Sequence, residues 1–206
     1  MPTPSQPDAG RVRMQVDARR QQLLELGLDL FSAHSYHELS IDRIAKAAGI
    51  SKGLLYHYFS SKREYYVATV RHAAAHWIEL TERATEVREG EAGDPAIMVR
   101  ALEVFFAQVR KHARAYTTLL RGGLGADGEL LEIVESTRQE FLARIFRRLT
   151  DAPTPIQRIA VRGWLGCVEA ASLDLLEHED VAVDKLCEVL VAALVQILVS
   201  VDLVDV

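Results

Sequence analysis

Hydrophobic residues recur at intervals of three and four positions along most of the chain, which is the spacing of one face of an α-helix. Gly, Pro and Asp residues interrupt this pattern between segments. No segment shows the apolar–polar alternation typical of a half-buried β-strand. The pattern predicts an all-α fold of about nine helices, at residues 16–34, 41–48, 51–58, 61–89, 95–109, 115–121, 127–149, 155–177 and 183–201.

Two of these helices are short and meet at a tight corner between residues 40 and 60. Ser40 can cap the first helix, and Gly49 suits the left-handed backbone that often ends a helix. Ser51 can cap the second helix only two residues later. This is the pattern of a helix-turn-helix, whose second helix can lie in the major groove of DNA. The alternative is an ordinary helical corner with capping serines.

The residues of this corner divide into an inner and an outer face. We expect the inner face to contain Ile44, Ile50, Leu54, Leu55, Tyr58 and Phe59. The outer face then presents a cation, hydroxyl groups, an imidazole and a glycine that permits close approach, which suit phosphates and base edges. The candidate DNA-binding residues are Ser40, Ser51, Lys52, Gly53, Tyr56, His57 and Lys62.

The run from Leu23 to Tyr66 contains LDLF and YHELSIDRIAKAAGISKGLLYHYFSSK, and it resembles the DNA-binding domain of the tetracycline-repressor (TetR) family of bacterial transcriptional regulators. The resemblance implies an N-terminal three-helix DNA-binding domain and a larger helical domain that binds small ligands and dimerises. It also implies that the recognition helix is residues 51–58 and that Ser40, Tyr56, His57 and Lys62 contact the DNA backbone. Arg63 and Tyr65 depart from the family pattern, in which an acid and a leucine are more usual.

The distribution of charge agrees with this division. The whole chain of 206 residues has a net charge of -5, yet residues 1–66 carry 9 Lys+Arg against 7 Asp+Glu, while residues 67–206 carry 15 against 22. We expect a disordered basic arm at residues 1–15, a helix-turn-helix domain at 16–62 and a ligand-binding and dimerisation domain at 63–206. The arm can either contact DNA beside the recognition helix or only solubilise the chain.

The last two predicted helices suggest a dimer. The helix at 183–201 is apolar on nearly every side and must be covered, but its apolar core is shorter than the about 20 residues that cross a bilayer. Small residues on the helix at 155–177 allow a partner helix to come close. We expect a homodimer through both helices, with no membrane association. The candidate interface residues are Gly163, Gly166, Ala170, Leu190, Leu194 and Ile197. A two-fold dimer requires a palindromic double-stranded DNA operator.

Aromatic and aliphatic residues of the larger domain are candidates for an apolar ligand cavity, although each can equally be solid core. They are Trp77, Met98, Leu102, Phe105, Phe106, Tyr116, Leu120, Phe141, Trp164 and Val168, with Arg121, Arg100 or Glu169 for a polar end of the ligand. The expected effector is small and largely apolar, and its binding is expected to release a repressor from its operator. The alternatives are a helical adaptor and a DNA-binding regulator without a small-molecule ligand.

The sequence gives little support to metal binding, phosphate binding or catalysis. His72 and His76 lie four residues apart, but the glutamate of an HExxH zinc motif is absent, and we predict no metal, no cofactor and no catalytic residue. The glycine-rich bend at 121–128 lacks the strand that precedes a phosphate-binding loop. Cys167 and Cys187 lie in apolar runs and are expected to be buried free thiols of a cytoplasmic protein.

Overall fold

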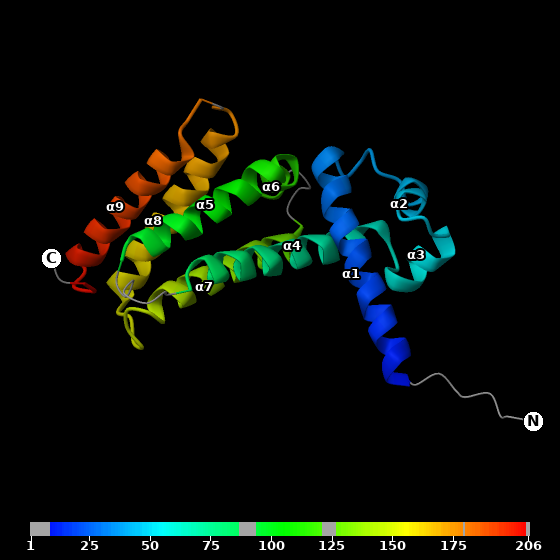
Figure 1. Ribbon diagram of the computed structural model, residues 1–206, viewed down its shortest axis with the longest axis horizontal. Helices are drawn as coiled ribbons and strands as arrows, with labels where there is room; N and C mark the ends of the chain where they lie inside the picture. Colours follow the sequence, from blue (N-terminus) through cyan, green and yellow to red (C-terminus); the bar gives the residue numbers. More distant parts are fainter. Residues whose placement is uncertain (1–8, 87–93, 121–126, 179, 205–206) are drawn as a thin grey trace, which may run out of the picture. The chain divides into compact units, whose positions relative to one another are not determined.

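The computed structural model describes residues 9–86, 94–120, 127–178 and 180–204. Within these ranges the chain forms nine α-helices and no β-strand (Figure 1), which confirms the predicted fold class. The helices are α1 (Ala9–Ala33), α2 (Ile41–Ala47), α3 (Lys52–Tyr58), α4 (Lys62–Ala84), α5 (Ala96–Lys111), α6 (Ala113–Leu120), α7 (Gly128–Phe146), α8 (Pro155–Leu175) and α9 (Val183–Ser200).

The first helix begins earlier than the sequence predicts. The sequence predicts a start at Val16 after a disordered arm at residues 1–15, but α1 already includes residues 9–15. Their sequence, AGRVRMQ, consists mainly of good helix formers, so its polar character does not by itself indicate disorder. The first eight residues of the predicted arm lie outside the described residues.

The chain divides into two compact units, the first ending at Ala73 and the second beginning at Ala74. The division falls inside α4, whereas the sequence analysis placed the domain boundary where this helix begins. The first turns of α4 contain Tyr65, Tyr66 and Val67, which are all buried. They belong to the core of the first unit, and α4 therefore contributes residues to both units.

Tyr65, one of the two departures from the TetR pattern, anchors α4 on α1 within the first unit. Its ring is fully buried, and its hydroxyl donates a 2.6 Å hydrogen bond to the Leu23 carbonyl. Burial raises the pKa of this phenol, which keeps it protonated as a donor. The helices approach closely at Gly27, where a Cβ atom would lie only 2.5 Å from Thr69 Oγ1 and 2.7 Å from the Tyr65 hydroxyl.

The core of the second unit lies where α9 packs against α5 and α8 (Figure 1). Phe106, Val161 and Cys187 are completely buried there. The Trp164 indole N–H donates a 2.8 Å hydrogen bond to the Leu190 carbonyl and so joins α8 to α9. No described helix combines the length and apolar character needed to span a membrane.

Candidate nucleic-acid interface and ligand cavity

The corner between α2 and α3 has the predicted caps. Ser40 Oγ accepts a 3.1 Å hydrogen bond from the Arg43 N–H, and Ser51 Oγ accepts one of 3.1 Å from the Leu54 N–H. Gly49 adopts φ 64°, the left-handed conformation in which a glycine is least strained. The corner therefore follows from local residues: two hydroxyl caps orient the helices and one glycine turns the chain between them.

The faces of α3 differ from the prediction at one position. Leu55 is fully buried, but Leu54 is 39% exposed and therefore lies on the outer face. A helix of two turns that packs with one face cannot bury two adjacent leucines equally, since successive side chains point about 100° apart. Tyr56 and His57 are exposed, as the prediction places them. Phe59 follows the helix in extended backbone and is buried.

The two predicted lysine contacts are both engaged within the first unit. Lys52 Nζ lies 3.0 Å from Asp42 Oδ2, and this hydrogen bond and charge raise the pKa of Lys52. Lys62 Nζ lies 4.1 Å from the centre of the Tyr36 ring, a cation–π distance. The sequence analysis did not single out Arg43, whose guanidinium lies 2.8 Å from His34 Nε2 on the exposed side of α2.

Gly53 is exposed in the first turn of α3, and the fold does not require a glycine there. A Cβ atom at this position would have only Ser51 Oγ within 4 Å, at 3.9 Å. Glycine inside a helix normally lowers stability relative to alanine. An exposed glycine with open space around it is therefore better explained by close approach of an external surface than by packing.

A mainly apolar cavity of about 100 Å³ lies in the second unit. Six of the predicted residues line it: Met98, Leu102, Phe105, Phe141, Trp164 and Val168. Ala101, Ile145 and Leu165 complete the apolar wall. These three are ordinary core residues in the sequence, and only the packing of the helices brings them to the cavity.

Other predicted cavity residues lie elsewhere. Phe106 is solid core, and the Tyr116 hydroxyl forms a buried 2.7 Å hydrogen bond with Ser172 Oγ. Trp77 packs beside Tyr116, with ring centres 5.7 Å apart. None of these three residues lines the cavity, and neither does Leu120, which is half-buried at the end of α6. Arg121 lies outside the described residues.

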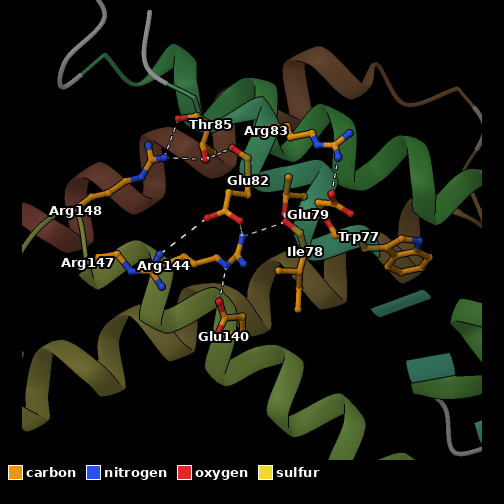
Figure 2. Close-up of polar contacts among 11 residues, drawn as sticks. Trp77, Ile78, Glu79, Glu82, Arg83, Thr85, Glu140, Arg144, Arg147 and Arg148 are labelled. Carbon is orange, nitrogen blue, oxygen red and sulfur yellow. Dashed lines mark hydrogen bonds and ion pairs between the residues drawn. The ribbon is translucent and has the colours of Figure 1, made fainter. Parts of the chain in front are cut away.

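The polar end of the cavity also differs from the prediction. Arg138 binds Glu169 with two hydrogen bonds of 2.6 and 2.8 Å, and Arg100 Nε donates to the Ala84 carbonyl at 3.4 Å, so neither Glu169 nor Arg100 lines the cavity. The polar lining instead comes from α4, α7 and the turn that follows each of them (Figure 2): Thr81, Glu82, Thr85, Arg144 and Arg148. In the sequence these are ordinary polar positions of helix surfaces.

An exposed stripe of small and apolar residues follows α8. Gly163, Gly166 and Ala170 are exposed, and a Cβ atom on either glycine would meet nothing within 4 Å. Ile156 and Ile159 on the same helix are 62% and 68% exposed. Cys167 also lies there, which contradicts the expectation that both thiols are buried.

The predicted interface on α9 needs correction. Leu190 and Leu194 are buried in the core of the chain itself and offer no surface to a partner, while Ile197 is half-buried. Most of the apolar side chains of α9 are buried within its own unit, where the helix packs against α5 and α8. Its exposed apolar side is instead formed by Val189, Ala192 and Ala193.

Among the described residues, no three His, Cys, Asp or Glu side chains are grouped as a metal site would require.

The chain matches two known sequence families. The bacterial regulatory proteins of the tetR family match residues 23–69. The tetracyclin repressor-like C-terminal domain matches residues 96–197. The first match includes both helices of the corner, and the second includes most of the helices that surround the cavity.

Individual relatives agree with these matches. A tetR-family transcriptional regulator from Streptomyces coelicolor has 33% identity and a TM-score of 0.77, and covers 89% of this chain and 83% of its own. A TetR-like regulator from Rhodococcus sp. RHA1 has 26% identity and a TM-score of 0.64, and covers 92% and 96%. The HTH-type transcriptional activator FasR of Mycolicibacterium smegmatis is 32% identical over 104 residues, 50% of this chain and 46% of FasR. The matched segment thus spans about half of this curated relative. Because both TetR sequence families match and the Streptomyces coelicolor regulator is similar over most of its length, the chain belongs to the TetR family of bacterial regulatory proteins.

Proposed function

We propose that the chain is a transcriptional regulator that binds a palindromic DNA operator as a homodimer. The observation that carries this proposal is the capped α2–α3 corner, whose second helix presents Lys52, Gly53, Tyr56 and His57 to solvent. These groups suit a helix placed in the major groove, with Lys52 and Gly53 toward the base edges, and Tyr56 and His57 at the phosphates together with Ser40 and Lys62. The relatives are transcriptional regulators, which favours a regulator over an enzyme or a helical adaptor.

The α8 stripe supports the dimer. Gly163, Gly166 and Ala170 permit a second helix to approach closely, and Ile156 and Ile159 supply apolar surface that a partner would cover. Together with Val189, Ala192 and Ala193 of α9, the stripe forms one side of a four-helix interface between two copies. Such a dimer presents two α3 helices, and an inverted repeat in the DNA matches its two-fold axis.

The cavity supports control by a small effector. Its wall is apolar, but its volume of about 100 Å³ is below the ~300–1,000 Å³ of a typical small-molecule site. We propose that the effector binds a wider form of this cavity and so shifts the dimer toward a state that releases DNA. In this scheme the chain is a repressor in the cytoplasm. FasR is named as an activator, so a transcription reporter in cells that lack the gene decides the direction of control.

A gel-shift assay with genomic fragments tests the DNA-binding proposal. We expect the wild-type chain to retard specific fragments, and Tyr56→Ala to weaken binding to all of them alike, because a phosphate contact carries no sequence information. Leu131→Ala serves as the control, since Leu131 is exposed on α7 in the second unit. Equal binding by wild type and Tyr56→Ala would contradict the assigned contact, and no retarded fragment would contradict DNA binding itself.

A further inference from the structure

The cavity combines an apolar wall with a charged mouth. Met98, Phe105 and Trp164 contribute to the wall, whereas Arg144 and Arg148 lie at the edge formed with α4. A purely apolar ligand would need no charge at this position. The partners of the charged groups at the mouth determine which charge is available to a ligand.

Arg144 is fully engaged by the protein. Its guanidinium lies 2.7 Å from Glu82 Oε2 and 2.7 Å from Glu140 Oε1, and it donates a 3.2 Å hydrogen bond to the Ile78 carbonyl (Figure 2). Two carboxylates thus surround one cation. The arrangement ties α4 to α7. Glu82 also lies 4.0 Å from Arg147 Nη1, so this carboxylate is paired with two arginines of the chain and is unsuited to a ligand cation.

Arg148 has a different environment. Its Nη2 atom donates to the Thr85 carbonyl at 2.8 Å and to Thr85 Oγ1 at 2.9 Å, both of which are neutral acceptors. A guanidinium has five N–H donors. Within the described part of the chain, neither of the hydrogen bonds of Arg148 neutralises its charge.

The charge balance of the mouth is therefore positive. Three charged residues line the cavity, Glu82, Arg144 and Arg148, so its lining contains two cations and one carboxylate. Arg147 does not line the cavity but a groove on another side of α7. The excess charge that faces the cavity is thus that of Arg148, an exposed residue at the edge of the apolar wall, where the protein surface attracts an anion more strongly than bulk water does.

We propose that the effector is an anionic amphiphile, an apolar chain or ring that carries a carboxylate or phosphate group. Its apolar part occupies the cavity, and its anionic group is bound by Arg148, whose planar guanidinium suits both groups. Arg148 is a specificity-determining residue in this account, and Arg144 is a positioning residue that holds Glu82 away from the ligand. This inference rests on the proposal that the cavity binds an effector.

Three ligands of equal chain length test the inference: decanoate, decyl phosphate and 1-decanol. Binding to the full-length chain is measured by calorimetry and by tryptophan fluorescence, to which Trp164 in the cavity wall contributes. We expect at least one anion to bind about tenfold or more tightly than decanol, as a charge-assisted hydrogen bond provides. The two anions show which head group is preferred. Equal affinity for decanol and both anions, or no binding of any of the three, would overturn the inference.

Two variants assign the preference to Arg148. Arg148→Gln should lower the affinity for the anion to the affinity for decanol. The affinity for decanol itself should not change, and this result would show that the cavity of the variant is intact. Arg147→Gln removes a neighbouring charge that does not line the cavity, leaves Glu82 paired with Arg144, and should keep the preference. If Arg148→Gln keeps the preference, the inference is wrong. Retardation of operator fragments by the ligand-free chain is measured separately, so that failure of ligand recognition is distinguished from failure of DNA binding.

Discussion

At the scale of single residues, the fold of the first unit depends on the phenol of Tyr65. Its buried hydrogen bond to the Leu23 carbonyl fixes α1 on α4 beside Gly27. Tyr65→Phe removes the donor and leaves the Leu23 carbonyl with only its bond inside α1, which should lower the free energy of unfolding by about 0.5–1.5 kcal/mol. Urea unfolding at fixed protein concentration measures this change.

Tyr56→Phe is the matched control for this substitution, because it removes an exposed hydroxyl from α3. We expect its unfolding midpoint to equal that of wild type while its affinity for the operator falls. Equal midpoints for Tyr65→Phe and wild type would show that the hydrogen bond from Tyr65 does not stabilise the first unit.

Residue roles were predictable from the sequence where they depend on near neighbours. Ser40 and Ser51 cap helices that begin directly after them, so three or four residues contain the necessary information. Leu54 and Leu190 were assigned to the wrong surface because helical spacing does not show which neighbouring helix covers an apolar side chain. Their burial depends on tertiary packing.

At the scale of elements, the α2–α3 corner contains two glycines with opposite roles. Gly49 has φ 64° and open space around it, so Gly49→Ala meets no steric clash but forces a left-handed residue with a side chain. We expect a loss of about 1–2 kcal/mol of stability. Gly53→Ala should instead raise stability by about 0.5–1 kcal/mol, since it lies within α3.

The same two variants are then compared for operator binding in gel shifts. Gly53→Ala should bind more weakly or prefer a different sequence, because its new methyl group lies between α3 and the DNA. Gly53→Ala could instead be more stable than wild type and bind the operator equally well. This result would contradict a close approach of α3 to DNA at this residue.

The elements themselves were more predictable than their ends. The nine helices of the described residues follow from apolar spacing and from breaks such as Pro155, where Thr154 forms a capping box with Gln157. The start of α1 was placed too late, because its first residues carry no apolar stripe. The arginines at the cavity mouth were missed for a related reason: Arg144 and Arg148 are ordinary surface cations in the sequence until α4 lies beside them.

At the scale of the whole molecule, the account requires two copies of the chain. Gly166 lies on the exposed α8 stripe, where a new side chain meets nothing within the protomer. Gly166→Leu should therefore leave the chain folded but convert the dimer to monomers, which sedimentation analysis measures. Gly128→Leu is the control, since Gly128 is equally exposed and open but lies at the start of α7. A Gly166→Leu dimer as tight as wild type would place the interface elsewhere.

The most direct test of the central claim is selection of random double-stranded DNA by the purified chain, followed by sequencing of the bound fraction. The account predicts enrichment of an inverted repeat whose half-sites are spaced by about one helical turn of DNA or a multiple of it, one half-site for each α3 helix. Enrichment of one unrepeated site, or no enrichment at all, would contradict it.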